Sequence, residues 1–366
     1  MNWLSMTETD QPKRTATIRQ ATAADLPAAR VLLSLRDERE WDQASADWFL
    51  CDLDPQRCLA WMAFAGDEPV GFSSMYVRAL DVQGDMKRVG YWANLYVHPA
   101  FRDQMLYPRL PMTMGQGLKP AGLAFLYAAV RQRDVAATHL RIGFGFIARL
   151  NVLLKPLRPA RLIAKHKKLG GLAQLLAWPV DVLFRAYLAI KKPRGDQDAV
   201  VTVIDLDSDE VDAAVALLNA QGGGCIGQRW TVVAFRERFR RTREGGRYTL
   251  LGVKKNAQLV ACVLWRMAER GEAIRAGVIM ATAGEPSSMA PALARAEQEG
   301  FEHGAELMLM MDGGGSELSA FFRRVGYRTS PETYDLLIWP KAALTADPRL
   351  AEADRWRLCF ADHDAF

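Results

Sequence analysis

The sequence predicts an α/β protein made of two successive units, and three observations lead to this fold class. Strand-like and helix-like runs alternate over residues 17–144. A similar order of runs returns after Val200, with little residue identity. Between these, an apolar run over 91–97 stops at His98-Pro99 and leads into a helix-like segment. Hydrophobic periodicity and turn residues separate the two kinds of run, and the large-period repetition indicates a duplicated architecture.

The predicted first unit opens with a strand over 17–22 and a helix over 23–33, with Thr22 as the helix N-cap. Strands over 58–65 and 70–79 flank a turn that contains glycine and proline, which predicts a hairpin. The rest of this unit consists of strands over 91–97 and 124–130 and a helix over 134–144. The second unit is predicted to have strands over 200–204, 248–254, 259–267, 275–282, 306–311 and 333–339, and helices over 209–218, 289–304 and 316–327.

The segment after the 91–97 strand has the features of a phosphate-binding site. A helix that begins there presents backbone N–H groups without helical partners, together with the positive end of its dipole. Arg102 adds a positive side chain, and the amides lie at Gln104, Met105, Leu106 and Tyr107. An ordinary strand–turn–helix corner without a ligand explains the same local pattern, and the sequence leaves this alternative open.

Three segments of the first unit resemble the GNAT superfamily of N-acetyltransferases. LYVHPAFR, which ends at Arg102, is similar to the start of that family's acyl-CoA pyrophosphate loop. AWMAFAGDEPVGFSSMYV resembles its strand pair, and the helix ending in Gly143-Phe144 resembles its Gly-Phe helix end. The resemblance implies two GNAT-like domains, each with a mixed, mostly antiparallel sheet flanked by helices. It also implies acyl-CoA or acetyl-CoA as a co-substrate.

The resemblance further implies which residues hold the coenzyme. Two loop positions that are glycine in the family are Met105 and Tyr107 here, and Pro108 removes one amide. The implied coenzyme contacts are Leu95, Val97, Arg102, Gln104, Met105, Leu106 and Tyr107.

Catalytic and acceptor residues are also implied by the resemblance. His139 stands four residues before Gly143, where many GNAT enzymes have a tyrosine that protonates the departing thiolate. The implied amine-binding residues are Asp37, Glu38, Trp41 and Asn94. Two alternatives remain open: His139 is a structural helix residue, and the acidic residues form a solvated face paired with Arg36 and Arg39. No residue stands out as a general base.

The second unit differs at the corresponding positions. Phe322 stands four residues before Gly326 and cannot transfer a proton, and Glu285 would repel a diphosphate in the corresponding loop. The sequence therefore assigns catalysis to the first unit and support or substrate contact to the second.

The length of 366 residues fits a leader over 1–14, GNAT-like domains over 15–160 and 199–345, a helical linker over 161–198 and a tail over 346–366. The leader is expected to be disordered and does not look like a signal peptide. Five cysteines without metal-ligand spacing predict reduced thiols, a cytoplasmic location and no metal. Adjacent Asp362, His363 and Asp364 are not expected to converge on one ion.

The segment over 165–194 has basic ends and an apolar centre, and its charges argue against a membrane span. It can lie peripherally on the inner face of an anionic membrane. Alternatively, a linker helix packs its apolar side between the domains, with Leu172, Leu175, Leu176, Val180, Leu183 and Phe184. Nucleic acid is an unfavoured partner, because no aromatic residues interleave with the charges.

The sequence thus favours an acyltransferase that moves an acetyl or longer acyl group from a CoA or carrier-protein thioester to an amine or aminoacyl substrate. One alternative is a non-catalytic GNAT-fold module that binds a ligand or a partner. Another is aminoacyl transfer from tRNA, as in tandem GNAT-fold peptidoglycan enzymes.

Overall fold

The computed structural model describes residues 15–167, 177–184, 186, 198–221, 223–240, 248–270, 274–313 and 316–363. The predicted leader 1–14 lies outside these residues, as do much of the predicted linker 161–198 and the last three residues of the tail. The chain forms two compact α/β units, one with residues up to 77 and 90–123, the other with 78–89 and 124 onward. Two long strands, β3 (Glu68–Val82) and β4 (Asp85–Val97), contribute residues to both units. The tandem division at 161–198 stays a prediction.

The first unit contains strands in the order β1 (Thr17–Gln20), β2 (Cys58–Ala65), β3 and β4. β2 pairs antiparallel with both β1 and β3, so the predicted hairpin is confirmed. The helices of this unit are η1 (Ala23–Asp25), α1 (Leu26–Asp37), α2 (Gln43–Phe49), η2 (Cys51–Leu53), η3 (Pro99–Gln104) and α3 (Leu106–Gln116).

Thr22 is the N-cap of the first helical turn, as predicted, and it forms a capping box with Asp25. The Asp25 carboxylate accepts hydrogen bonds from the Thr22 amide at 2.8 Å and from Arg19 Nη2 at 2.7 Å. The hydrogen bond from Arg19 is the largest influence on Asp25 and lowers the pKa of its carboxyl to about 2. This pair fixes the start of α1 relative to β1.

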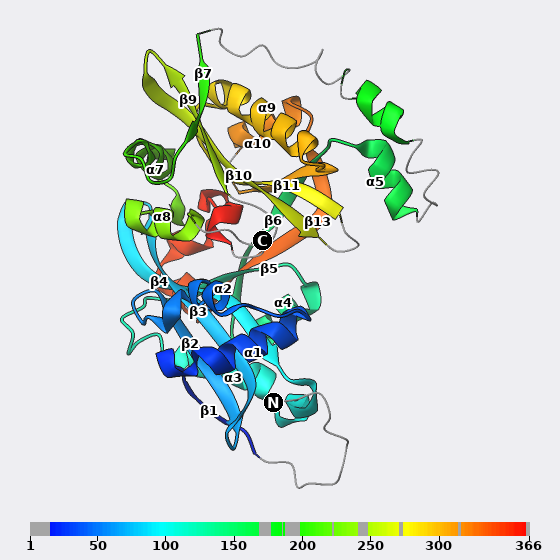
Figure 1. Cartoon of the computed structure of the whole chain (residues 1–366). Helices are drawn as coiled ribbons and strands as arrows, with labels where there is room; N and C mark the ends of the chain where they lie inside the picture. Colours follow the sequence, from blue (N-terminus) through cyan, green and yellow to red (C-terminus); the bar gives the residue numbers. More distant parts are fainter. Residues whose placement is uncertain are drawn as a thin grey trace. The chain divides into compact units, whose positions relative to one another are not determined.

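The second unit has the strand order β5-β13-β6-β12-β11-β10-β9-β7 (Figure 1). In this order, β11 and β12 pair in parallel and the other neighbouring strands pair antiparallel, which gives a mixed, mostly antiparallel sheet over the described residues. The strands are β5 (Leu126–Val130), β6 (Gly145–Pro156), β7 (Val200–Ile204), β8 (Ile226–Gln228), β9 (Thr249–Lys255), β10 (Gln258–Arg270), β11 (Ile274–Gly284), β12 (Leu307–Asp312) and β13 (Arg328–Trp339). The helices are α4 (Arg133–Arg141), α5 (Pro159–His166), a helix over 177–184, α7 (Glu210–Gln221), α8 (Val232–Phe239), α9 (Pro286–Glu302), α10 (Ser316–Arg324) and α11 (Ala343–Ala346), with 3-10 turns η4 (Pro348–Ala351), η5 (Ala353–Arg355) and η6 (Phe360–Asp362).

The position of β13 differs from the sequence-based expectation that it closes the sheet of the second half. β13 lies between β5 and β6, so the last strand of the predicted second half pairs with two strands of the predicted first half. β6 was not predicted as a strand, and it pairs with β12 on its other edge. Strand neighbours far apart in sequence are set by long-range pairing, which local periodicity does not report.

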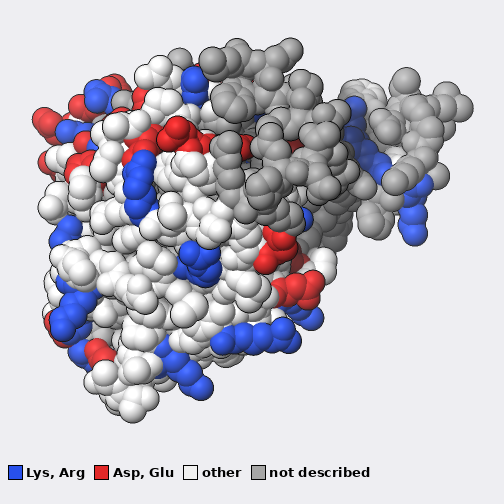
Figure 2. All heavy atoms as spheres, turned by 90° about the horizontal axis from the view of Figure 1, so that it is seen from below, with Lys and Arg blue, Asp and Glu red and all other residues white. Residues whose placement is uncertain are grey.

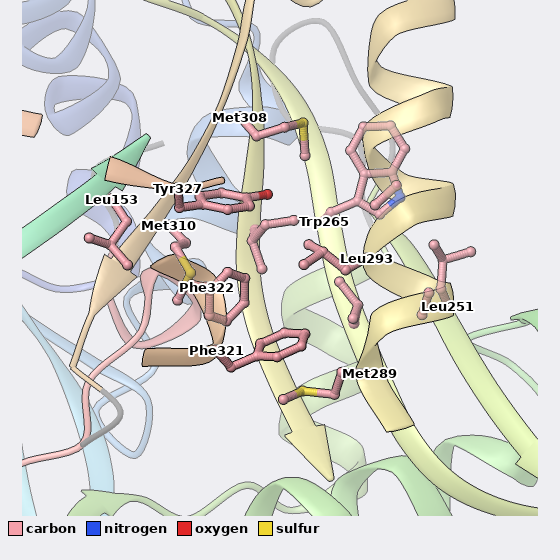
Figure 3. Close-up of a cluster of buried hydrophobic side chains, with 14 of the residues drawn as sticks. Leu153, Leu251, Trp265, Met289, Leu293, Met308, Met310, Phe321, Phe322 and Tyr327 are labelled. Atoms are coloured by element: carbon pink, nitrogen blue, oxygen red, sulfur yellow. The ribbon is translucent and has the colours of Figure 1, made fainter. Parts of the chain in front are cut away.

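The core of the second unit lies between the sheet and helices α9 and α10 (Figure 3). Figure 1 shows α7 on the other side of strands β9–β11. The close-up shows side chains of this core from two strands and one helix: Trp265 of β10, Met308 and Met310 of β12, and Phe321 and Phe322 of α10. All five are at least 94% buried, so each contributes roughly 1.5–3 kcal/mol of apolar transfer free energy to this face.

Candidate functional site

The predicted phosphate-binding corner has the expected strand–turn–helix form. β4 ends at Val97, and the His98 Nδ1 atom accepts a hydrogen bond from the Ala100 amide at 3.3 Å at the start of η3. Met105 then adopts a left-handed backbone, with φ of 56°, and α3 begins at Leu106. The first-turn amides of α3 therefore belong to Leu106 and Tyr107, and Pro108 contributes none.

The side chains of this corner divide into exposed and anchored groups. Arg102 is exposed, and the Met105 side chain is 63% exposed, so methionine does not fill the interior behind the loop. The Gln104 side chain accepts a hydrogen bond from the Ala16 amide at 2.9 Å, which ties the loop to the chain before β1. Tyr107 is half-buried, and this burial raises the pKa of its hydroxyl. Of the two implied strand contacts, Val97 is buried and Leu95 half-buried.

Three of the four predicted amine-binding residues are connected through Arg36, which the sequence indicated only as an ion-pair partner. The Arg36 guanidinium donates to the Asp37 carboxylate, with Nε 2.6 Å from Oδ1, and to the Asn94 side-chain oxygen. Trp41 Nε1 also donates to Asp37, at 3.0 Å. Burial by itself raises the pKa of the Asp37 carboxyl, but the hydrogen bonds from Arg36 and Trp41 and the positive charges nearby outweigh it and lower the pKa.

The strand side of this cluster is also fully hydrogen-bonded. Asn94 is 3% exposed, and its Nδ2 atom donates to Ser74 Oγ at 2.8 Å. Glu38 is not part of the cluster, because it is exposed and ends α1 with a left-handed backbone at φ of 53°. Since Asp37 is already paired with a cation, the cluster holds α1 against β4 and leaves little charge to attract an amine.

His139 lies inside the protein. Its side chain is fully buried in α4, and its Nδ1 atom is 2.5 Å from the Val135 carbonyl oxygen, to which it donates. Burial lowers the pKa of the imidazole to about 4, so the ring is neutral at physiological pH. With the proton on Nδ1, the Nε2 atom is an acceptor and has no proton to give. This geometry favours the structural alternative for His139 over the role of a thiolate-protonating acid.

A pocket opens in the second unit where β11 and β12 separate. The two strands pair in parallel from Ala276↔Leu307 to Ile279↔Met310, and the residues that follow on each strand line the pocket. The pocket encloses about 730 Å³ of space, part of which is its open mouth. Its walls come from α7, β8, β11, β12, α10 and the C-terminal tail, and they include Leu218, Trp230, Met280, Met310, Met311 and Leu318.

The polar side chains of this pocket belong to Gln221, Gln228, Thr282, Arg357, Cys359 and Asp362. Gln221 Oε1 and Gln228 Oε1 are buried and have no hydrogen-bond partner within the described chain. Asp362 adds a carboxylate that is 5% exposed, and Arg357 adds a cation whose Nε atom lies 3.1 Å from Cys225 Sγ. Both oxygens are almost fully shielded from solvent, so they are buried polar atoms of the pocket wall.

The C-terminal tail brings Asp362 to the pocket. The Arg357 amide donates to the Ile226 carbonyl of β8 at 2.8 Å, and a Cβ atom at Gly313 would lie 2.1 Å from the Leu358 carbonyl oxygen. Asp362 accepts from the Cys359 amide at 2.9 Å and from Cys359 Sγ at 3.1 Å. Burial raises the pKa of the Asp362 carboxyl, and hydrogen bonds from Cys359 oppose that shift without cancelling it.

The sequence suggested the tail only as an unfavoured metal site. Within the described chain, no three His, Cys, Asp or Glu side chains come together as a metal-binding group, and Asp364 lies outside the described residues.

By sequence, the chain matches no protein-family model and no curated protein. Its structure is similar to that of a GCN5-related N-acetyltransferase from Anabaena variabilis, with a TM-score of 0.62 and 6% identity over 88% of this chain and 72% of that chain. A probable N-acyltransferase from Enterococcus faecalis gives a TM-score of 0.62 and 9% identity, over 90% and 74% of the two chains. N-myristoyltransferase from Saccharomyces cerevisiae with bound myristoyl-CoA gives 0.60 and 11%, over 91% and 85%. The chain has a GNAT-like fold.

Two groups of this GNAT-like fold were missed by sequence reasoning. Arg36 was visible as a charge next to Asp37, but its contact with Asn94 joins residues 58 positions apart. Asp362 stood in a short acidic tail whose course past β8 and β12 no local pattern predicts. In both cases the missing signal was a long-range contact.

Proposed function

We propose that this protein is an N-acyltransferase that moves an acyl group from a thioester to an amine. The observation that carries the proposal is the β4–η3–α3 corner, which combines exposed Arg102 with the first-turn amides of α3 in a GNAT-like fold. The similarity to acetyl- and myristoyltransferases supports acyl transfer in general, and one of these neighbours was solved with bound myristoyl-CoA.

The donor is an acyl-CoA or acetyl-CoA whose diphosphate lies at the N-terminus of α3. The amides of Leu106 and Tyr107 and the dipole of α3 favour an anion there. Arg102 adds a charge that pairs with a phosphate oxygen. A left-handed Met105 supplies the turn for which glycine is the usual choice, at a modest conformational cost.

Within the second unit, the pocket between β11 and β12 is the candidate amine site, because its wall combines apolar side chains with the Asp362 carboxylate. Gln221, Gln228 and Asp362 give this pocket polar side chains, and the methionine-rich wall takes an apolar body. Asp362 is the candidate base, since burial raises the pKa of its carboxyl toward the range in which proton transfer is efficient.

The proposed reaction balances without a metal or a redox partner. The amine nitrogen attacks the thioester carbonyl carbon, the new C–N bond forms and the C–S bond breaks. The nitrogen gives up a proton to the base, and the departing sulfur takes up one. His139 has no part in these steps, because its neutral ring is buried and hydrogen-bonded to Val135.

The donor site is tested by thermal shift with a series of acyl-CoA thioesters from acetyl to myristoyl. We expect the melting temperature to rise with at least one of them, and the Arg102→Glu variant to lose most of that rise. Arg133→Glu reverses another exposed arginine and should leave the shift intact. If no acyl-CoA raises the melting temperature but an acyl carrier protein thioester binds, the acyl donor is a carrier-protein thioester.

The acceptor site is tested by initial rates with a panel of apolar primary amines. Asp362→Asn should lower kcat by about 10²–10⁴-fold and remove the rise of kcat with pH that deprotonation of Asp362 produces. Asp354→Asn, at an exposed carboxyl of the same tail, should change neither. An unchanged pH profile in Asp362→Asn would restrict this residue to its structural contact with Cys359.

A second candidate function is a non-catalytic module that binds a ligand or partner. Met105, Tyr107 and Pro108 favour it, because the loop offers fewer close backbone contacts than a glycine-rich one. A melting-temperature shift with acyl-CoA without turnover of any amine would support this candidate over the enzyme.

A further inference from the structure

The short helix over 177–184 presents an apolar surface to the solvent. Trp178 is 63% exposed and Leu183 is 71% exposed. The remaining exposed positions of this helix are Pro179, Val180 and Val182, so every solvent-facing residue from 177 to 184 is apolar. Helices on the surface of globular proteins normally place polar residues there, and a contiguous exposed apolar face marks an interaction site.

The inward face of the same helix explains its orientation. Ala177 is 5% exposed and Asp181 is 2% exposed, and these two positions lie one turn apart. The Asp181 carboxylate accepts hydrogen bonds from the amides of Ala160, at 2.8 Å, and Arg161, at 3.3 Å. Asp181 therefore satisfies the first amides of α5, and this interaction turns the apolar side of the second helix outward.

α5 in turn is fixed to the second unit. The Arg158 guanidinium donates to the Phe301 carbonyl at 2.7 Å and stacks over the Phe301 ring. Lys165 Nζ lies 2.6 Å from Glu306 Oε1, whose side chain is 2% exposed. The apolar face of 177–184 is thus carried on an anchored helix, and Ile163 of α5, 58% exposed, adds to it.

The sequence around the 177–184 helix is strongly positive. Residues 155–194 contain ten Lys and Arg residues and a single acidic residue, Asp181, which is buried. This stretch carries a net charge of +9, whereas the whole chain carries +5, so the rest of the chain is net negative. Figure 2 shows that, on one face of the molecule, Lys and Arg side chains are interspersed with Asp and Glu side chains and uncharged surface.

We propose that the 177–184 helix, together with the exposed side of α5, binds the surface of an anionic lipid membrane. Tryptophan and aliphatic side chains enter the boundary between headgroups and acyl chains, while Arg161 and Lys167, in α5 and at its C-cap, pair with lipid phosphates and carboxylates. The alternative that Val180 and Leu183 pack between domains is not supported, because both are more than half exposed. Among the helices of the described residues, none has both the length and the apolarity needed to cross a bilayer.

The test is co-sedimentation of the full chain with phosphatidylcholine vesicles, with and without phosphatidylserine. We expect binding to the phosphatidylserine vesicles, weaker binding to the neutral ones, and partial loss at high salt. The double variant Trp178→Gln, Leu183→Gln should bind at least about tenfold more weakly, since it loses two apolar anchors. Val233→Gln removes an equally exposed apolar residue, 66% exposed, from α8 and should bind like the wild type.

Several outcomes would overturn the proposal. They are no binding to anionic vesicles, equal binding by the double variant, or equal loss in the Val233→Gln control. A fourth is a wild-type dimer that the double variant converts to a monomer without any vesicle binding, which would assign the apolar face to a second copy of the chain. Because neither position touches the acyl-CoA corner, acyl-CoA thermal shifts of the double variant report separately on the proposed enzyme function.

Discussion

Helices α4 and α10 end in the same way but place different rings in the core. Each helix is followed by a glycine with positive φ, 104° at Gly143 and 103° at Gly326. In each helix, the backbone amide of the residue after the glycine donates to the carbonyl oxygen of the residue four positions before the glycine. These bonds join Phe144 to His139 at 3.1 Å and Tyr327 to Phe322 at 2.9 Å. This is the Schellman arrangement, which brings the side chains of those two residues together.

The ring pairs formed by this arrangement are closely similar. The His139 and Phe144 ring centroids are 5.1 Å apart at 76°, and those of Phe322 and Tyr327 are 5.1 Å apart at 86°. His139 therefore occupies a position that the fold uses for an aromatic ring in the core. The difference between the helices is the imidazole polarity, part of which the Val135 carbonyl satisfies. Histidine is a residue type suited to catalysis, but here the Schellman motif at the end of α4 places His139 in the core.

The largest expected effect comes from removing the ring on the α10 side. Phe322→Ala should lower the free energy of unfolding by about 3–5 kcal/mol, because the side chain is 1% exposed and leaves a cavity in the core. Urea denaturation followed by circular dichroism measures this change. Phe146→Ala, at a ring that is 47% exposed on β6, serves as the control and should cost much less. Equal losses would mean that ring burial at this helix end is not what stabilises it.

The second effect is a pH dependence confined to the α4 side. The pKa of His139 is about 4 in the folded chain and near 6.5 when unfolded, so the unfolded state binds the proton more readily. Stability from this group is present above pH 6.5 and is lost as the pH falls toward 4, by about 3 kcal/mol in total.

A His139→Phe variant should show a correspondingly smaller loss over the same pH range, measured by urea denaturation at each pH. His303→Gln is the matched control, because His303 makes the same kind of contact, with Nδ1 2.7 Å from the Glu299 carbonyl, but is exposed. If His139→Phe and the wild type lose stability in parallel, His139 is accessible to protons in the folded state, and its role as an acid returns.

The smallest effect concerns the two glycines. Gly143→Ala and Gly326→Ala should each cost about 1–2 kcal/mol, because a Cβ atom disfavours positive φ. The costs should be similar, since a Cβ atom would meet no neighbour closer than 3.6 Å at Gly143 and 3.4 Å at Gly326. Differential scanning calorimetry of both variants checks the comparison. A clear loss at one site and none at the other would show that the two helix ends are not equivalent.

Local signals predicted much of the fold. The hairpin of β2 and β3 followed from two strand-like runs that flank a turn containing Gly66 and Pro69, and the end of α4 followed from Gly143. The strand over 200–204 has its predicted bounds as β7. Each of these features depends on hydrogen bonds and side-chain spacing within about ten residues, which a sequence displays directly.

The candidate site was less predictable. The corner after β4 was found because strand, proline and helix are adjacent in sequence. The equivalence of His139 with Phe322 was also found, but burial of His139 was not, since it depends on what packs against α4. The pocket at the separation of β11 and β12 was missed because its polar residues, including Gln221, Gln228 and Asp362, come from elements far apart in the sequence.

By itself, the amino-acid order determined the α/β class, the order of elements, the positive corner after Pro99 and the basic, apolar character of 165–194. Tertiary structure decided that β13 lies between β5 and β6, that His139 is a core residue, that Asp362 reaches a pocket and that Asp181 turns Trp178 outward. The physical reason is the sequence separation of the contacts involved. Turns, caps and periodicity depend on neighbouring residues, whereas strand order, burial and the protonation state that follows from burial depend on contacts between residues far apart in the chain.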